Sequence, residues 1–440
     1  MKKGEVTPMT SQADYQERRT RLMDTLPPDS IVVIPAAKHH YMTNDIPYVY
    51  RQNSDFSYLC GMQEPGSVMV LYKENSGETK FHLFVRPRSA HSELWDGPRT
   101  GIERASAFFG CTETSNVESF ADELNGLLEG KKTLFWRDIE TDASNFKKSI
   151  DSSQLKKVEL KNLLCKLRLI KTMPEIELMR KSCSISSRAF IDTMKDTIPD
   201  CSEHVMSAKI EYECRRRGSQ RLAYPPVVAT GISCNTLHYV MNDSIAKDGD
   251  MLLMDAGGEY FDYSSDITRT WPTNGKFTPA QRTIYEAVLR TQKRIIAAAR
   301  THLEVENDEG VKKRIPTTLA HLQHMALEST MAELMEMGIH EEQHLPKCYP
   351  HMIGHFLGMD VHDVSSVPYT EPLKPGMIIT VEPGLYMPVE EWVPEPLRGI
   401  GVRIEDDVLI TEGEPEVLTR ECPKEVADLE HIIGANHKAA

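Results

Sequence analysis

MDAGGEYFDYSSDITRTWP, residues 254–272, has the pattern of two paired β-strands interrupted by two carboxylates. The apolar residues 251–254 predict the first strand, and residues 267–271 predict the second. The glycines and the serine pair between them predict the turn region. The stretch therefore predicts an antiparallel β-hairpin.

Two aspartates of this hairpin face each other in the simplest register. With the turn centred between Tyr260 and Phe261, Asp255 lies opposite Asp266, and facing Cβ atoms come within about 5 Å. Two anions at that distance repel, so either one carboxyl group is protonated or a cation lies between them. Taken alone, the same residues are equally typical of two turn aspartates on a solvated hairpin.

Three later segments supply further polar side chains in apolar surroundings, where a polar group is costly to bury without a partner. They are PHMIGHFLGMDVHD at residues 350–363, MIITVEPG at residues 377–384 and GVRIEDDVL at residues 401–409. The second segment predicts a strand that ends on Glu382. The third alternates with period two, which predicts Arg403, Glu405 and Asp407 on one face of a strand.

Together these segments offer an oxygen-rich ligand set that suits two hard or borderline divalent ions. The set consists of Asp255, Asp266, Glu382, Glu405 and one histidine of residues 350–363. Each member alone has an ordinary alternative, because a lone histidine in an apolar segment is more often a core residue than a ligand. A glutamate before Pro-Gly is likewise often only the end of a strand.

The order and spacing of these segments resemble the dinuclear metallopeptidases of the aminopeptidase P, prolidase and methionine aminopeptidase superfamily. The shared pattern is a DAG whose aspartate is separated by ten residues from a second aspartate, followed by HxxGHFLGxDVHD, PGMxxTVEPG and GVRIEDD. Five further segments are similar to the aminopeptidase P family, and most of all to its mitochondrial, intermediate-cleaving members: YRQNSDFSYLCG (50–61), ELWDGPRTG (93–101), YPPVV (224–228), NTLHY (235–239) and SDITRTWP (265–272). The resemblance covers nearly the whole chain.

The length and the resemblance both indicate two domains. At 440 residues the chain is too long for one ordinary core. The resemblance implies an α/β (α+β) fold. It places an N-terminal α/β aminopeptidase P domain, concerned with oligomerisation and substrate access, over residues 1–168. A catalytic pita-bread metallopeptidase domain follows over residues 169–440.

Local patterns predict individual elements of both domains. Strands are predicted at residues 31–35, 68–72, 81–85 and 133–136, a hairpin loop at residues 74–79, and helices at residues 12–23, 279–299 and 319–337. Thr172 followed by Glu175 makes a capping box, which predicts that a helix begins there. The charged cluster of the first helix, residues 17–19 with Arg21, predicts a solvated face. The charged stretch of residues 301–316 is expected to be exposed.

The resemblance implies a role for each ligand. Asp266 and Glu405 bridge two ions, Asp255 completes the coordination of one, and His355 with Glu382 completes that of the other. Glu382 is also the expected proton shuttle between the nucleophile and the amine. Oxygen-rich ligation with one imidazole favours Mn2+, with Zn2+ or Co2+ as alternatives.

One residue is expected to hold these ligands in place. Arg403 shares a strand face with Glu405, so it can pair with a ligand carboxylate and keep its geometry, helped by Tyr386. The ordinary alternative for Arg403 is a cross-strand ion pair.

Five residues are expected to contact the substrate. His238, His351 and His362 resemble the family's catalytic and substrate-side histidines, which hydrogen-bond the substrate or the developing oxyanion. Their ordinary alternative is a core or surface histidine. Tyr224 and Trp95 are the other expected contacts, and in the family the counterpart of Trp95 reaches a neighbouring subunit's site.

The implied reaction is hydrolysis of an N-terminal Xaa-Pro peptide bond by a hydroxide that bridges two metal ions. Resemblance to the intermediate-cleaving members adds trimming of one N-terminal residue from presequence-cleaved mitochondrial proteins. The expected partners are peptide or protein N-termini with proline at the second position, and a homodimer or homotetramer is expected. Two alternatives stay open: prolidase, which needs an Xaa-Pro dipeptide, and a catalytically inactive pita-bread scaffold that binds partners.

Composition argues against several other classes. The formal net charge of −14 argues against nucleic acid or an anionic membrane as the main partner. No apolar run approaches the roughly 18 residues of a membrane span. The nine cysteines are scattered, odd in number and without CxxC spacing, which predicts free thiols in a reducing compartment. The resemblance implies a mitochondrial location, with the cytoplasm as the alternative, and residues 1–6 resemble no targeting segment.

Overall fold

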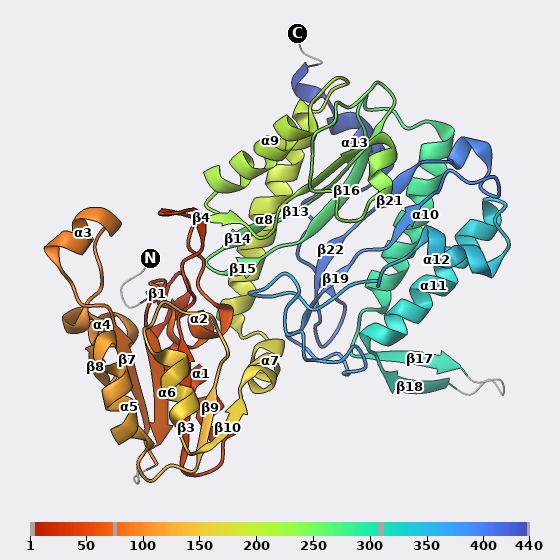
Figure 1. Ribbon diagram of the computed structural model, residues 1–440. Coiled ribbons are helices and arrows are strands. Elements are labelled where there is room, and N and C mark those ends of the chain that lie inside the picture. Colours follow the sequence, from red (N-terminus) through yellow and green to blue (C-terminus); the bar gives the residue numbers. More distant parts are fainter. Residues whose placement is uncertain (1–4, 74–76, 307–311, 438–440) are drawn as a thin grey trace. The chain divides into compact units, whose positions relative to one another are not determined.

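The computed structural model describes residues 5–73, 77–306 and 312–437. The chain divides into two compact units, Met1–Leu167 and Arg168–Ala440, and each has its own apolar core (Figure 1). Both units mix helices and strands, which confirms the predicted α/β (α+β) class. Along the described residues, no helix combines the length and the apolar character needed to cross a membrane.

The N-terminal unit is built on a six-stranded mixed sheet. In sheet order its strands are β10 (Lys156–Glu159), β9 (Thr133–Trp136), β3 (Ser30–Pro35), β6 (Val68–Lys73), β7 (Thr79–Val85) and β8 (Glu113–Asn116). The runs SIVVIP and VMVLYK are apolar on both faces because both faces are covered. Helices α5 (Phe120–Leu128) and α6 (Phe146–Ser152) pack on this sheet, and α1 (Gln12–Asp24) contacts β6 and β7 (Figure 1).

These elements confirm the four predicted strands and the first predicted helix. The predicted hairpin loop at residues 74–79 lies partly outside the described residues. Two short hairpins and further helices complete the description of this unit: β1 (Glu5–Thr7) with β2 (Thr10–Ser11), β4 (Tyr41–Thr43) with β5 (Ile46–Pro47), α2 (Ser54–Cys60), α3 (Ala90–Asp96), α4 (Ile102–Phe109) and α7 (Lys161–Leu169).

The solvated face predicted for the charged cluster of α1 is wrong for two of its residues. Arg18 and Arg19 are each only 3% exposed. Arg18 donates from Nη1 to the carbonyl oxygen of Tyr58 at 3.1 Å, and Arg19 donates to that of Leu59 at 2.8 Å. Both acceptors lie in the last turn of α2, where carbonyl groups lack helical partners and favour a cation. The hydrogen bonds to these two carbonyl oxygens offset the cost of burying the two guanidinium groups.

The C-terminal unit combines two pairs of helices with short antiparallel sheets. Helices α8 (Met173–Asp196) and α9 (Glu203–Arg216) pack together, as do α10 (Pro279–Ala298) and α11 (Leu319–Glu336). The bounds of α10 and α11 confirm two predicted helices, and α8 begins at the predicted capping box, whereas α9 was not predicted.

The remaining strands and α-helices of this unit are mostly short. They are β11 (Arg221–Leu222), β12 (Val227–Thr230), β13 (Met251–Ala256), β14 (Gly258–Tyr260), β15 (Tyr263–Ser264), β16 (Ile267–Pro272), β17 (His302–Glu306), β18 (Lys312–Pro316), α12 (Leu345–Cys348), β19 (Ile378–Val381), β20 (Gly384–Tyr386), β21 (Gly401–Arg403), β22 (Asp406–Leu409), β23 (Glu416–Val417) and α13 (Val426–Ile432).

The predicted hairpin forms, but its register differs from the predicted one. Asp255 pairs with Thr268 and not with Asp266, because Phe261 and Asp262 are the central residues of the turn. Both have positive φ, 47° and 68°, as the central positions of a type I′ turn require. Moving the turn centre by one residue moves each partner by two, so the two carboxylates still share one face.

The segment of residues 401–409 forms two strands instead of the single alternating strand that its pattern predicts. Strand β21 pairs with β20, and β22 pairs with β19. Between them, the main-chain N–H of Glu405 donates to the carbonyl oxygen of Thr268 at 3.0 Å. The break therefore fastens Glu405 to β16, beside the hairpin that carries the two aspartates.

The nine cysteines are free thiols in the structure, and eight of them are buried, as the prediction of unpaired cysteines requires. In the charged stretch of residues 301–316, strands β17 and β18 form a hairpin on which Lys312, Lys313 and Arg314 are exposed, which confirms that part of the prediction. Residues 307–311 of the stretch lie outside the described residues.

Candidate functional site

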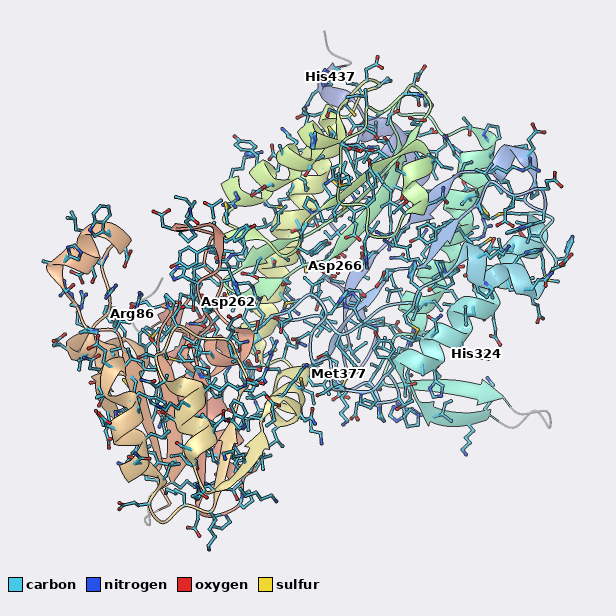
Figure 2. All side chains as sticks on the ribbon, viewed as in Figure 1. Arg86, Asp262, Asp266, His324, Met377 and His437 are labelled. Carbon is cyan, nitrogen blue, oxygen red and sulfur yellow. The ribbon has the colours of Figure 1, made fainter. Side chains whose placement is uncertain are left out.

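Three predicted ligands that are distant in sequence meet in the C-terminal unit. One oxygen each of Asp266 and Glu405 and one ring nitrogen of His355 all lie within 4.8 Å of one another. Asp266, labelled in Figure 2, directly precedes β16, and Glu405 lies between β21 and β22. His355 is held beside β19, where its carbonyl oxygen accepts a hydrogen bond from Thr380. Groups at this spacing can share a metal ion.

Glu382 and Asp255 adjoin these three residues. The Nε2 atom of His355 lies 3.5 Å from Glu382 Oε1 and 3.5 Å from Asp266 Oδ2. The hydroxyl of Tyr224 lies 2.6 Å from Asp255 Oδ1 and 2.5 Å from Asp266 Oδ1. The structure thus brings all five predicted ligands together. It also places Tyr224, a predicted substrate contact, against two of the carboxylates.

Four carboxylates in so small a volume need positive charge. Burial raises the pKa of Glu405 well above its usual range and that of Glu382 to about 7, and the neighbouring Asp266 raises both. Glu405 is only 2% exposed, so water screens little of this repulsion. Two divalent cations would balance four negative charges, and oxygen donors with one imidazole suit hard or borderline ions. The donor set therefore fits two divalent metal ions.

Arg403 is a cation that the chain itself supplies to this cluster. Its side chain is 4% exposed, and its guanidinium donates from Nη2 to Asp255 Oδ2 at 2.7 Å. It also donates from Nη1 to the hydroxyl of Tyr386 at 2.8 Å, and that hydroxyl lies 2.9 Å from Nε2 of His351. Because a guanidinium can only donate hydrogen bonds, Arg403 orients both the carboxylate and the phenol.

His355 has one ring nitrogen directed at the main chain and the other at the carboxylates. Its Nδ1 lies 3.2 Å from the carbonyl oxygen of Phe356, to which it donates, so Nε2 faces Asp266 and Glu382. Burial lowers the pKa of His355, but the two carboxylates outweigh it and raise the value to about 9. Without metal, His355 is therefore protonated at neutral pH, and a ligated ion would displace that proton.

The metal-free protein is expected to lose stability as the pH rises from about 6.5 to about 9. Folding raises the pKa of His355 from 6.5 to about 9, so its stabilising contribution is complete below the first value and is lost through the second. The raised pKa of Glu382, about 7, acts in the same direction. The histidine contribution is about 3 kcal/mol at most. Urea unfolding of chelator-treated protein across this range measures it.

His355→Gln provides the control for this prediction, because glutamine cannot take up the proton. The stability of the metal-free variant should depend less on pH between about 6.5 and 9 than that of the parent. Equal slopes would contradict the prediction. Titration of His351 does not interfere, since burial lowers its pKa to about 4, below this range.

The three predicted substrate-side histidines differ in how closely they approach the ligands. Nδ1 of His351 lies 3.8 Å from Glu382 Oε2. The ring of His362 stands edge-on to that of His355, with centroids 4.4 Å apart. His238 is exposed, whereas burial lowers the pKa of both His351 and His362, and the neighbouring Arg403 and His355 respectively add to that effect. His351 and His362 thus lie beside two of the predicted ligands.

A pocket of about 210 Å3 opens beside His355 and His362. The rest of its lining is largely apolar and comes from Phe356, Asp363, Val364, Ser365, Val367 and Tyr369. A mostly apolar wall with a few polar groups on one side is typical of sites for small molecules and peptide side chains.

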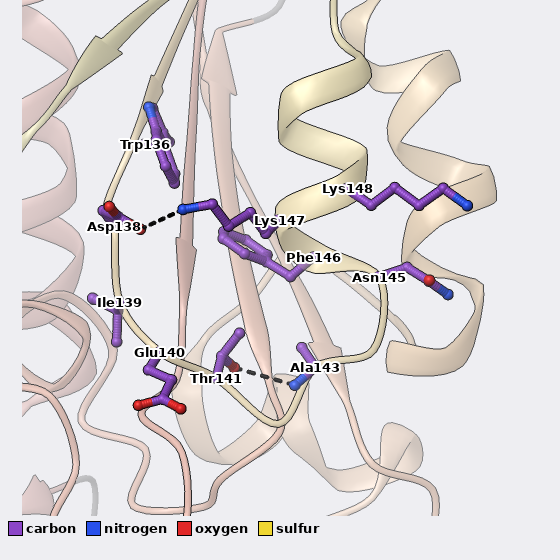
Figure 3. A pocket seen from close by; sticks show the side chains of 10 residues that line it. All are labelled: Trp136, Asp138, Ile139, Glu140, Thr141, Ala143, Asn145, Phe146, Lys147 and Lys148. Carbon is purple, nitrogen blue, oxygen red and sulfur yellow. Dashed lines mark hydrogen bonds and ion pairs between the residues drawn. The ribbon is translucent and has the colours of Figure 1, made fainter.

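A second pocket lies within the N-terminal unit, beyond the end of β9 (Figure 3). Its volume is about 390 Å3, and its lining includes Trp136 and several charged residues. Figure 3 shows Lys147 directed at Asp138, and their Nζ and Oδ1 atoms lie 3.5 Å apart. Glu140 is paired with Lys38 at 2.7 Å. With these charges paired and exposed, the pocket gives no reason to place a reaction there.

Trp95, a predicted substrate contact, lies in α3 of the N-terminal unit. Its side chain is 76% exposed. A contact with a neighbouring subunit stays a prediction.

Two threonines that the sequence patterns did not single out contact the ligands. Thr380 Oγ1 accepts from the main-chain N–H of His355 at 3.0 Å and donates to Glu382 Oε1 at 3.4 Å. Thr268 Oγ1 lies 2.7 Å from Glu405 Oε2. Each threonine stands two residues from a predicted ligand along the chain, so the period of a strand was a signal that could have identified it.

Two sequence families match the chain. Residues 177–412, which include all five predicted ligands, match metallopeptidase family M24, and residues 15–136 match the N-terminal domain of aminopeptidase P. Human Xaa-Pro aminopeptidase 3 is 40% identical over 460 residues, which cover 98% of this chain and 88% of that protein. The mitochondrial intermediate cleaving peptidase 55 of Arabidopsis thaliana is 39% identical over 443 residues, which cover 99% and 86%. The solved structure of Escherichia coli aminopeptidase P with the inhibitor Pro-Leu has a TM-score of 0.90 and 32% identity, and it covers 97% of this chain and 99% of that chain.

Proposed function

The chain belongs to metallopeptidase family M24, and on this premise we propose that it is a metal-dependent aminopeptidase that releases the N-terminal residue from peptides with proline at the second position. Its C-terminal unit is the pita-bread metallopeptidase domain, and its N-terminal unit is the aminopeptidase P domain. The observation that carries the proposal is the meeting of four carboxylates and one imidazole in a chain that matches Xaa-Pro aminopeptidases over nearly its whole length. Relatives named as aminopeptidases disfavour the prolidase alternative.

The inactive-scaffold alternative is disfavoured by the ligand positions themselves. Each of the five positions carries a side chain that can ligate a divalent ion: Asp255, Asp266, His355, Glu382 and Glu405. In this proposal Asp266 and Glu405 would help to hold both ions, Asp255 would hold one, and His355 and Glu382 would hold the other. Arg403 and Tyr386 hold the ligands in place.

The bound ions would supply an activated water as nucleophile and would polarise the scissile carbonyl group. Glu382 accepts a proton from the attacking water and delivers it to the leaving amine. Its position 3.5 Å from His355 Nε2 keeps the carboxylate beside the metal ligands.

The substrate binds on the side of the carboxylates where the three histidines lie. His238, His351 and His362 hydrogen-bond the peptide or the developing oxyanion. The short distances from His351 to Glu382 and from His362 to His355 support this role for these two histidines. The free amino group of the substrate binds beside this cluster of carboxylates, as an exopeptidase requires.

The metal in this proposal is Mn2+, with Zn2+ or Co2+ as alternatives. Four oxygen donors and one imidazole without any thiolate favour manganese. Elemental analysis of protein purified without added metal, followed by titration with each ion, distinguishes them.

The proposals for oligomeric state and cellular location rest on the similarity to aminopeptidase P and to the intermediate cleaving peptidases. The N-terminal unit is proposed to mediate a homodimer or homotetramer and to control substrate access, with the exposed Trp95 reaching a neighbouring subunit's site. The chain is proposed to act in mitochondria, trimming one residue from presequence-cleaved proteins, as the name of the Arabidopsis relative suggests. Light scattering of the purified protein and subcellular fractionation test the two proposals, and a cytoplasmic signal would support the alternative location.

Hydrolysis of an Xaa-Pro-Xaa tripeptide by chelator-treated protein, with and without added Mn2+, tests the function. We expect release of the N-terminal residue only when metal is present, and much slower release from the matched Xaa-Ala-Xaa peptide. A resistant tripeptide together with a cleaved Xaa-Pro dipeptide would indicate prolidase. Metal binding without cleavage of any of these peptides would indicate a scaffold.

A further inference from the structure

Thr268 connects the buried arginine of the site to a metal ligand. Arg403 Nε donates to Thr268 Oγ1 at 3.1 Å, and that oxygen lies 2.7 Å from Glu405 Oε2. A guanidinium has no acceptor, so the lone pair of the hydroxyl receives the arginine hydrogen. The single hydroxyl hydrogen is then left for Glu405. The direction of the chain of hydrogen bonds is therefore determined, from Arg403 through Thr268 to the carboxylate.

The backbone around this hydroxyl is held from the opposite side of the strand. Arg269 is fully buried, and each of its five N–H groups has an acceptor. The acceptors are the carbonyl oxygens of Pro423, Thr268, Glu405 and Cys422 and one carboxylate oxygen of Asp406. Glu405 also donates its main-chain N–H to the carbonyl oxygen of Thr268 at 3.0 Å. Thr268 and Glu405 are therefore joined by one main-chain hydrogen bond and one side-chain hydrogen bond.

We propose that Thr268 is a positioning residue that keeps the Glu405 carboxylate in one orientation and so sets the affinity of the site for its divalent ions. The inference rests on the proposed metal-dependent function. A carboxylate that must find its orientation on binding pays conformational entropy that a pre-oriented one does not. Groups that support a ligand in this way typically change metal affinity by about 10- to 100-fold when they are removed.

The test is Mn2+ binding by chelator-treated protein, measured calorimetrically without substrate. Thr268→Val keeps the shape of the side chain and removes the hydroxyl, and we expect its affinity for Mn2+ to fall by about 10- to 100-fold. Thr268→Ser keeps the hydroxyl and should restore affinity to within about threefold of the parent. An unchanged affinity in Thr268→Val would overturn the proposal.

Thr270→Val is the matched control on the same strand. Thr270 is also fully buried two residues further on, and its hydroxyl donates to the carbonyl oxygen of Arg403 at 2.9 Å and accepts the Arg403 N–H at 3.2 Å. Both valine variants thus lose two hydrogen bonds, and both should unfold more readily. Only Thr268→Val should bind Mn2+ more weakly. Equal loss of affinity in both variants would mean that the effect comes from disturbance of β16 alone.

The outcome separates this inference from the proposed function. If the parent binds no divalent ion, the proposed metal-dependent function fails. If the parent binds Mn2+ and cleaves the tripeptide while Thr268→Val binds the ion equally well, only the role of Thr268 is rejected. At saturating Mn2+ we expect Thr268→Val to regain most of its kcat with an unchanged KM for peptide.

Discussion

Asp266→Asn is expected to lower kcat/KM toward an Xaa-Pro-Xaa tripeptide by about 10³-fold or more. The Asp266 carboxylate stands at the centre of the cluster, 3.5 Å from His355 Nε2 and within hydrogen-bonding distance of the Tyr224 hydroxyl that also contacts Asp255. Asparagine keeps the shape of the side chain, but it removes one negative charge and puts an NH2 group where an oxygen ligand stood. Steady-state kinetics with added Mn2+ measure the loss.

Metal content should fall together with activity in this variant. We expect fewer ions per chain by elemental analysis than in the parent, because a bridging ligand would serve both ions. Asp248→Asn makes the same chemical change at an exposed aspartate and should keep both activity and metal. Full activity in Asp266→Asn would exclude Asp266 from the proposed metal site.

Arg403→Met is expected to destabilise the metal-free protein by about 3–5 kcal/mol. The guanidinium forms a buried ion pair with Asp255, with side chains 4% and 17% exposed. Removing it leaves the Asp255 carboxylate without its ion-pair partner, and methionine fills only the apolar volume. Urea unfolding of chelator-treated protein measures the difference. The loss should be smaller with metal bound, because the ions then supply positive charge.

Arg300→Met tests whether any arginine in an ion pair would give the same result. Arg300 contacts Glu414 at the surface, with side chains 42% and 74% exposed, so its loss should cost less than about 1 kcal/mol. A loss as small as this in Arg403→Met would contradict the view that Arg403 offsets the acidic cluster.

Local patterns were sufficient where the stabilising contacts are themselves local. The capping box that starts α8 joins Thr172 to Glu175, only three residues away, so its two hydrogen bonds can be anticipated from the sequence. The apolar runs of β3 and β6 likewise predict buried strands. Local patterns were insufficient for Arg18 and Arg19, because the carbonyl groups that accept their hydrogen bonds lie in α2, about forty residues later in the chain.

The hairpin illustrates the same limit on a smaller scale. The sequence predicted its two strands and the turn region between them. A turn centred one residue earlier would have satisfied the same pattern. The positive φ angles of Phe261 and Asp262 select the observed centre. The predicted partner of Asp255 and the observed one, Thr268, differ by two residues. Because this number is even, Asp255 and Asp266 lie on the same face in both registers.

The sequence was enough to identify several of the longer helices and buried strands and the family, and its motifs named the candidate ligands. The sequence did not show that these ligands meet, and each ligand alone has an ordinary alternative. Whether a carboxylate faces water or other carboxylates depends on segments that meet only after folding, such as Thr268 and Glu405, which are 137 residues apart and joined at 2.7 Å. Burial then raises the pKa of Glu382 and Glu405, which shows that their charged forms are costly in this cluster unless cations offset them.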